Sequence, residues 1–380
     1  MYHLVVAQID MEIYNTPSDH SQCKPLGKLL SVIIPTYNMQ DYLPRCVQSL
    51  LSAHKRELLE IIVVNDGSKD NSLNIALGYA EKYPDSMVVV DKENANYGSC
   101  INAGINVAKG KYIKILDADD CYDTEALDEV LCHLVDVDVD LVITDFVRVY
   151  ANGKQSLKSY HLQPNTVLDY SQIRFQSEVF KLWMHSAAYR LDNLRKLNYH
   201  QTEHISYTDV EWTFLPMVTV NTAYYIKVPL YRYTLGREGQ TVDPKVVAVK
   251  FGDNVKCTMS MIKSYVDFIM LGDKGAFEQN GFKFNNEENL EMLEKKLLRR
   301  IKTIYKFYLV KNRKIDLKEL NEMDVFMKEV SPRLYSLSNQ FVVSSPAFPY
   351  HFVKSWRKNG NSRRFNLMIM LYRLLKYHKL

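Results

Sequence analysis

The sequence predicts an α/β fold whose mostly parallel sheet carries helices on both faces, followed by a helical C-terminal region. Apolar strands and amphipathic helices alternate with short connections through the first 150 residues, which is the order expected of a parallel sheet. The first strands are continuous apolar runs, which are typical of strands buried on both faces. Beyond residue 245 the apolar positions recur at helical spacing in three long segments.

The composition is that of an ordinary globular protein. Apolar residues make up 47% and charged residues 24% of the 380 positions, which is enough to bury a core. The net charge of +4 is too small to indicate binding of nucleic acid. The six cysteines form no C-x-x-C pair, which disfavours a zinc site or a disulfide framework and predicts a reducing, cytoplasmic setting.

Neither a membrane span nor a leader is expected from the sequence. No run of 18 apolar residues occurs, so we expect no transmembrane helix. Residues 1–20 lack the basic start and apolar core of a secretory signal. We interpret residues 1–28 as an N-terminal extension that precedes the first strand.

Five strands are expected in the first half of the chain, at residues 29–35, 59–64, 87–90, 112–116 and 141–144. Helices are expected between them, over about 41–54, 70–83, 100–108 and 124–134. Polar stretches at residues 36–38, 66–67 and 117–119 directly follow the first, second and fourth strands. Open parallel sheets bind ligands at the carboxyl ends of their strands. We therefore expect these three stretches to meet in one binding site.

Three carboxylates lie within four residues, at Asp117, Asp119 and Asp120. If the strand continues, the side chains of Asp117 and Asp119 point to the same side, where their charges repel each other. Hard divalent cations take oxygen ligands and bridge carboxylates to phosphate groups. An isolated D-x-D pattern is also common in solvated turns. The neighbouring polar stretches are what favour a cation site here.

The order and spacing of four stretches resemble the nucleotide-sugar domain of family-2 glycosyltransferases. These stretches are SVIIPTYN, IIVVNDGSKDNS, ENANYGSCINAGINVAKGKYIKILDADD and DLVITDF. The resemblance is dense over residues 29–150 and thinner over 180–245, so we assign a domain to residues 29–245. The family has the GT-A fold, which is the fold that the resemblance implies for this chain.

The resemblance also implies a nucleotide-sugar donor, which we interpret as UDP-linked, and Mn²⁺ or Mg²⁺ as cofactor. Asp66 would hydrogen bond the uracil edge, and Asp119, with Asp117 beside it near the ribose, would hold the metal on the diphosphate. The donor-binding residues carried over from the family are Pro35, Thr36, Tyr37, Asp66, Gly67, Gly98, Asn102, Asp117, Asp119 and Arg237.

Two positions depart from the family pattern. Asn65 stands where many members have Asp, and Ile101 stands where many have an Arg that neutralises the diphosphate. The second departure makes the metal, or a later basic residue, more necessary. Arg237 lies in a segment that resembles the closing loop of the family and is suited to phosphate. A solvated Arg in a surface loop is the alternative.

The stretch at residues 206–212 resembles the motif that carries the general base of these enzymes. Thr208 replaces the usual Glu, and Asp209 remains. A general base needs one carboxylate within hydrogen-bond reach of the acceptor hydroxyl. The alternative is that Asp209 only caps the helix that follows. Glu211 is the second choice for the base.

These features predict an inverting, metal-dependent transferase acting on a saccharide or lipid-linked acceptor, in surface or capsular polysaccharide synthesis. That setting rests on the resemblance alone. A nucleotidyltransferase would need a Gly-rich basic loop after the first strand, and residues 36–39 do not provide it. A catalytically silent sugar- or partner-binding module would tolerate the loss of Asp119 or Asp209, yet both are present.

The rest of the chain divides into a helical region at 246–330, a Ser-, Pro- and Asn-rich linker-like segment at 331–362, and a basic tail at 363–380. On a helical wheel the tail gathers Leu367, Met370, Leu371, Leu374 and Leu375 on one side. Such a helix can lie peripherally at the inner face of the cell membrane. The alternatives are that this side packs on the preceding helices or on a second copy, in a homodimer.

Overall fold

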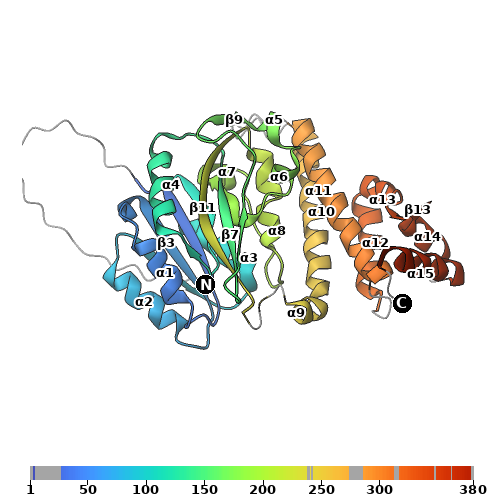
Figure 1. Cartoon of the computed structure of the whole chain (residues 1–380), viewed down its shortest axis with the longest axis horizontal. Helices are drawn as coiled ribbons and strands as arrows, with labels where there is room; N and C mark the ends of the chain where they lie inside the picture. Colours follow the sequence, from blue (N-terminus) through green and yellow to red (C-terminus); the bar gives the residue numbers. More distant parts are fainter. Residues whose placement is uncertain are drawn as a thin grey trace, which may run out of the picture. The chain divides into compact units, whose positions relative to one another are not determined.

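The chain forms two compact units, residues 1–246 and 247–380, in a computed structural model (Figure 1). The structure describes residues 3–4, 27–237, 240, 243–273, 286–311, 316–345, 348–360 and 362–377. Most of the predicted N-terminal extension, 1–28, therefore lies outside the described residues.

The first unit is built on one large, mostly parallel sheet. Its strands follow the order β1-β4-β3-β2-β5-β10-β7-β11-β6. The bounds are β1 His3–Leu4, β2 Leu30–Thr36, β3 Leu59–Asp66, β4 Met87–Lys92, β5 Tyr112–Ile115, β6 Cys121–Tyr122, β7 Leu141–Tyr150, β10 Ala187–Arg190 and β11 Thr222–Leu235. The pairs β4–β3, β3–β2, β2–β5 and β7–β11 are parallel, which confirms the predicted class of fold.

Strand β10 was not predicted from the sequence. β10 pairs antiparallel with β5 on one side and with β7 on the other. Its four residues are too few for a period-2 pattern to stand out. Two shorter strands, β8 Gln155–Lys158 and β9 Val167–Asp169, pair with β7 and β11 at the side of the sheet.

Helices cover both faces of this sheet. Val32 and Ile34 of β2 belong to the core cluster that also contains buried residues of α1 and α4. The intervening Ile33 contacts α3, where an added Cβ at Gly104 would lie 2.6 Å from its side chain. Side chains alternate along a strand, so β2 packs against a helix on each face. These helices are α1 Leu43–Leu51, α2 Ser72–Lys82, α3 Asn96–Val107 and α4 Thr124–Asp136.

Short elements connect β9 to β11. They are α5 Tyr170–Ile173, α6 Ser177–Phe180, the 3-10 turn Met184–Ser186, α7 Leu191–Lys196, α8 Asp209–Trp212 and the 3-10 turn Leu215–Thr219. Several aromatic side chains in this region are almost fully buried, among them Tyr170, Tyr189 and Trp212. The region therefore belongs to the core of the first unit.

The second unit is mainly helical, as predicted. Its elements are α10 Phe251–Asp273, α11 Asn286–Lys306, the π-helical turn Phe307–Lys311, α12 Lys318–Val330, α13 Pro332–Ser338, β12 Val342–Ser345, β13 Phe348–His351, α14 Phe352–Asn359 and α15 Arg363–Tyr377, and α9 Pro244–Val249 spans the boundary between the units. Along α11, Leu293, Leu297, Ile301 and Ile304 form a buried stripe.

The linker-like interpretation of residues 331–362 was wrong, because the structure places two helices and a β-hairpin there. Although this segment is rich in Ser and Pro, its apolar residues Leu334, Phe352 and Trp356 are buried and contribute to the core of the second unit. Arg357 adds hydrogen bonds to the Asp324 carboxylate and to the backbone of Tyr335. No helix in the described part of the chain is long and apolar enough to cross a membrane.

A lysine is buried in the middle of the sheet. Lys114 of β5 is 1% exposed, and its Nζ donates a hydrogen bond to the backbone oxygen of His185 at 2.7 Å. Burial lowers the pKa of Lys114 to about 7. In the unfolded chain the same amine keeps its ordinary pKa near 10.5.

We expect Lys114→Met to remove a pH dependence of stability. Between pH 7 and 10 the unfolded state holds the proton that the folded state has released, so stability of the native protein rises with pH, by up to about 1.4 kcal/mol per unit. Urea unfolding across this range measures the difference between the two proteins. The exposed Lys109→Met serves as control. If the stability of Lys114→Met changed with pH in parallel with that of the native protein, the lowered pKa of Lys114 would be contradicted.

Candidate active site

Four chain segments meet at the carboxyl edge of the sheet. β2, β3 and β5 are parallel, so Thr36, Asp66 and Asp117 emerge at the same edge. β10 runs antiparallel between β5 and β7, and β11 is parallel to β7. β11 therefore ends at this edge as well, and Arg237 follows its last residue.

The acidic turn after β5 is tied to β11 by its third carboxylate, Asp120. Its side chain is fully buried and accepts hydrogen bonds from the Tyr231 hydroxyl at 2.7 Å and from the Thr234 backbone N–H at 2.6 Å. The backbone N–H of Asp117 donates to the same Tyr231 hydroxyl at 3.1 Å. The sequence analysis assigned no role to Asp120.

Burial and mutual repulsion raise the pKa of two of these carboxyl groups. The pKa of Asp117 rises to about 7, through burial and then through the charge of Asp119. The pKa of Asp120 rises to about 8, through burial and then through the charges of Asp117 and Asp119. The Tyr97 hydroxyl, which donates to Asp117 Oδ1 at 2.8 Å, partly offsets the shift of Asp117. The turn therefore concentrates negative potential that a cation would relieve.

Asp119 has a positively charged partner. Arg237 Nε donates to Asp119 Oδ2 at 2.9 Å, and Gln240 Nε2 donates to the same oxygen at 3.2 Å. The guanidinium of Arg45, from α1, donates to the backbone oxygen of Asp119 at 2.6 Å. The predicted closing-loop arginine thus contacts the acidic turn directly.

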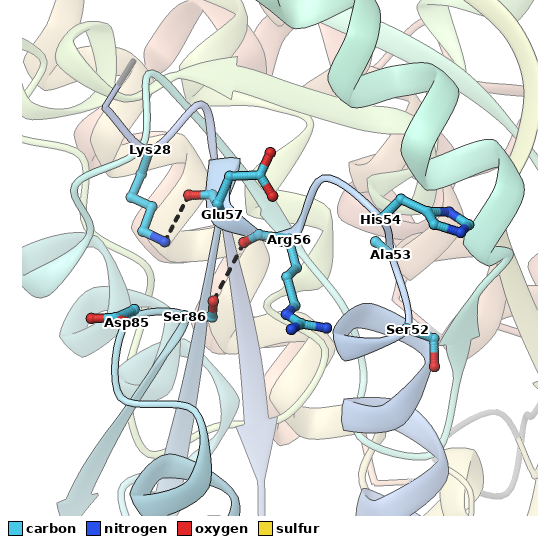
Figure 2. Close-up of a pocket in the computed structure, with 8 residues that line it drawn as sticks. All are labelled: Lys28, Ser52, Ala53, His54, Arg56, Glu57, Asp85 and Ser86. Atoms are coloured by element: carbon cyan, nitrogen blue, oxygen red, sulfur yellow. Dashed lines mark hydrogen bonds between the residues drawn. The ribbon is translucent and has the colours of Figure 1, made fainter. Parts of the chain in front are cut away.

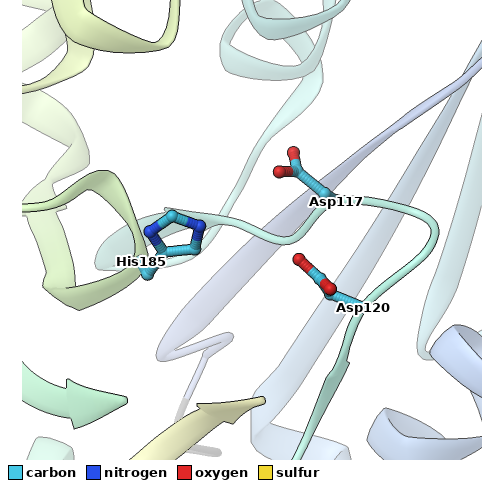
Figure 3. A group of neighbouring side chains, drawn as sticks. All are labelled: Asp117, Asp120 and His185. Carbon is cyan, nitrogen blue, oxygen red and sulfur yellow. The ribbon is translucent and has the colours of Figure 1, made fainter. Parts of the chain in front are cut away.

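A second arrangement of ligand atoms lies beside the predicted metal pair. Asp117, Asp120 and His185 each offer one ligand atom, and these atoms lie within 4.8 Å of one another (Figure 3). His185 is 6% exposed, and its Nδ1 has no hydrogen-bond partner in the described part of the chain. Burial lowers the pKa of His185 to about 3, so the imidazole is neutral. The sequence analysis paired Asp117 with Asp119 instead and did not include His185 in the site.

The residues predicted to contact the nucleoside base lie at the ends of β2 and β3. Tyr37 is 46% exposed, whereas Thr36 is buried. Asp66 is also buried, and its Oδ1 accepts hydrogen bonds from Lys92 Nζ and from the Ala95 backbone N–H. Gly67 adopts a φ of +68°, a conformation that favours glycine.

The loops after β2 and β3 hold each other through side chains. The backbone N–H groups of Asn38 and Met39 donate to Ser68 and Ser72, and the Lys69 N–H donates to Asn38 Oδ1. These bonds fix the position of the exposed Tyr37 relative to the turn at residue 67. Pro35, the last predicted base contact, lies inside β2.

Gly98 and Asn102 of α3 hold the segment that leads to Asp209. A Cβ at Gly98 would lie 2.1 Å from the carbonyl oxygen of Thr202, so no larger residue fits there. Asn102 accepts from the Gln201 N–H at 2.8 Å and donates to the Gln201 carbonyl at 3.0 Å. Their predicted position beside the donor stays a prediction.

The two acidic residues of α8 have different surroundings. Glu211 is buried, and its two oxygens accept from the backbone N–H and the hydroxyl of Thr202 at 2.8 and 2.7 Å. Asp209 is partly exposed, and its charge contributes to the raised pKa values of Tyr97 and Asp117. The N-cap of α8 is Thr208, so the alternative that Asp209 is the capping residue was wrong.

A separate pocket of about 480 Å³ lies at the opposite, amino-terminal edge of the strands (Figure 2). Lys28 donates to the backbone oxygen of Glu57 there, and Ser86 donates to that of Arg56. These residues precede β2, β3 and β4, whereas the acidic turn follows β5. The pocket is therefore not part of the site.

Known proteins share both the sequence and the fold of this region. Residues 31–198 match the model of Glycosyl transferase family 2. The uncharacterized glycosyltransferase YibD of Escherichia coli K12 is 33% identical over 214 residues, 54% of this chain and 61% of YibD. The uncharacterized glycosyltransferase MG025 homolog of Mycoplasma pneumoniae is 28% identical over 219 residues, 56% of this chain and 70% of that protein.

A crystal structure of S. aureus TarS in complex with UDP-GlcNAc has a TM-score of 0.63 to this chain. The match covers 92% of this chain and 93% of that one at 18% identity, and at this identity it establishes the fold alone. The GT-A fold expected from the sequence is thereby confirmed. Residues 31–198 of this chain therefore resemble the domain of glycosyltransferase family 2.

Proposed function

We propose that the chain transfers a sugar from a UDP-sugar to a hydroxyl of a saccharide or lipid-linked acceptor, with a divalent cation and inversion at the anomeric carbon. One observation carries this proposal. The charge of Asp209 helps to raise the pKa of Asp117, so Asp209 lies near the acidic turn at the carboxyl edge of the sheet. A cation site beside a carboxylate base is what this reaction requires.

The donor end of the site fits a uridine nucleotide. Tyr37 directly follows Pro35 and Thr36 and offers an exposed ring, in a loop that is hydrogen-bonded to the residues after Gly67. Asp66 uses Oδ1 for Lys92 and for the Ala95 N–H, which supports a role for Oδ2 in accepting the uracil N3–H. The UDP-GlcNAc bound to TarS, a structure of the same fold, also supports this class of donor.

The donor set at the acidic turn fits Mn²⁺ or Mg²⁺. Asp119 and Asp117 would hold the ion, with Asp120 and His185 close by. The contact between Arg237 and Asp119 supports this assignment, because it shows that this carboxylate takes a positive partner. The ion, when bound, neutralises the diphosphate as it leaves. Arg237 then leaves Asp119 for a diphosphate oxygen and replaces the charge that is missing at Ile101.

The general base in this proposal is Asp209. Its carboxylate accepts the proton of the acceptor hydroxyl as the hydroxyl oxygen bonds to the anomeric carbon. The bond from that carbon to the UDP oxygen breaks on the opposite side, so the configuration inverts. Glu211 is unsuited to the role, because both of its oxygens are engaged by Thr202.

We infer a role in surface or capsular polysaccharide synthesis at the cytoplasmic face of the membrane, where lipid-linked acceptors are available. This setting rests on the family and on the basic C-terminal tail. The reaction at the acceptor is the same for a free and a lipid-linked saccharide, since a hydroxyl is the nucleophile in both.

Removal of the metal should weaken binding of UDP. Without a cation the diphosphate meets the carboxylates of Asp117 and Asp119, so we expect the affinity to fall at least about tenfold in the presence of EDTA. Titration calorimetry with UDP, in MnCl₂ and in EDTA, measures this, and uridine is the control ligand because it lacks the diphosphate. Equal affinity of UDP under both conditions would remove the metal from the mechanism.

Substitutions at the two acids of α8 should separate chemistry from stability. We expect Asp209→Asn to keep the affinity for UDP and the unfolding midpoint, and to lower transfer by about 100-fold, because the amide accepts no proton. Glu211→Ala should instead lower the free energy of unfolding by about 2 kcal/mol, since Thr202 loses its buried acceptor. Turnover assays and urea unfolding test both. The exposed Glu129→Ala is the control. Near-normal turnover in Asp209→Asn would exclude it as the base.

A further inference from the structure

Helix α15 has two apolar faces that point in opposite directions. Phe365, Ile369 and Tyr372 are 1%, 0% and 3% exposed and follow the i, i+4, i+7 spacing of one helical face. α15 packs with this face in the second unit, where it contacts α14 and β12. The helix is therefore anchored through a face other than the one that carries Leu367, Met370 and Leu371.

The opposite face of α15 is apolar and exposed. Leu367, Met370 and Leu371 are 50%, 42% and 36% exposed and follow the i, i+3, i+4 spacing of a single stripe. We call these three residues the outer stripe. For these three residues the alternative that they pack on the preceding helices was wrong, because they are exposed and a different face makes that contact. An exposed apolar stripe of this kind indicates a surface that meets another partner.

The charges around the outer stripe are all positive. Arg363, Arg364 and Arg373 of the same helix are exposed. No Asp or Glu occurs between Glu329 and residue 380, so α15 itself carries no acidic residue. Arg357 is not counted among these charges, because Asp324 already neutralises it.

We propose that α15 docks on the surface of an anionic membrane, with the outer stripe in the interface and Arg363, Arg364 and Arg373 on lipid headgroups. An amphipathic helix with basic residues beside its apolar face binds in this way, in the plane of the interface. Each basic residue near an anionic leaflet adds to the attraction. The absence of a spanning helix in the described part of the chain agrees with a helix that lies on the bilayer.

A second copy of the chain is a poorer occupant of the outer stripe. In a two-fold dimer the same patch faces itself, so the arginines of the two copies would be brought together. No acidic residue of this segment could separate them, since none follows Glu329. An anionic lipid surface supplies the missing negative charge.

Flotation with vesicles tests the proposal on the full-length protein. The vesicles contain phosphatidylcholine alone or phosphatidylcholine with phosphatidylglycerol. We expect flotation only with phosphatidylglycerol, and a loss of at least about tenfold in Leu367→Glu/Met370→Glu. Arg363→Gln/Arg364→Gln/Arg373→Gln keeps the apolar stripe and should lose the dependence on phosphatidylglycerol. Val325→Glu on α12 is the matched control, because Val325 is also an exposed apolar residue of the second unit.

All the substituted side chains are exposed, so the variants should keep the native far-ultraviolet spectrum and the affinity for UDP, which separates this test from that of sugar transfer.

Two results would overturn the proposal. One is that the native protein floats with neither kind of vesicle, or that the glutamate variant floats as well as the native protein does. The other is a dimer in sedimentation that the glutamate variant dissociates, which would assign the outer stripe to a second copy.

Discussion

The geometry of the site depends on the buried carboxyl group of Asp120. It joins the turn after β5 to the end of β11 through the Tyr231 hydroxyl and the Thr234 N–H. These two segments are separated by more than one hundred residues in the chain, and Asp120 fixes their register at the sheet edge. Asp117 depends on the same tyrosine, and the segment that carries Arg237 begins just beyond Thr234. A neutral, protonated Asp120 suits this role, because burial of a charge is costly.

The first half of the fold could be predicted because its strands are local apolar runs. β2, β3, β4, β5 and β7 all begin within one residue of their predicted starts, although β7 extends to Tyr150, beyond its predicted end at 144. The first half of β11 gains hydrogen bonds from both β7 and β9. Pro229 lies within β11 at an irregularity in its register with β7, where proline is tolerated. Such pairing is set by tertiary contacts and leaves no local pattern.

The sequence predicted those residues of the site that belong to recognisable motifs. Asp117, Asp119 and Arg237 do come together. The spacing of Asp117 and Asp119 pointed to the first two, and the resemblance to the family's closing loop pointed to Arg237. The partners that hold them, such as Tyr97 and Tyr231, were missed because each acts across a large separation in sequence. Residues of this kind have no signature in a single chain.

The close contact between Gly98 and Thr202 has a consequence for protein engineering. Segment 200–203 is clamped to α3 by this contact and by Asn102, while Glu211 ties the start of α8 back to the same segment. A chimera that exchanges residues 199–212 for the equivalent loop of a relative would therefore have to import the glycine and the asparagine of α3 together with the loop. In a chimera without this glycine and asparagine, the loop would not pack against α3. The carboxylate of the grafted loop at the position of Asp209 would then be misplaced in the site.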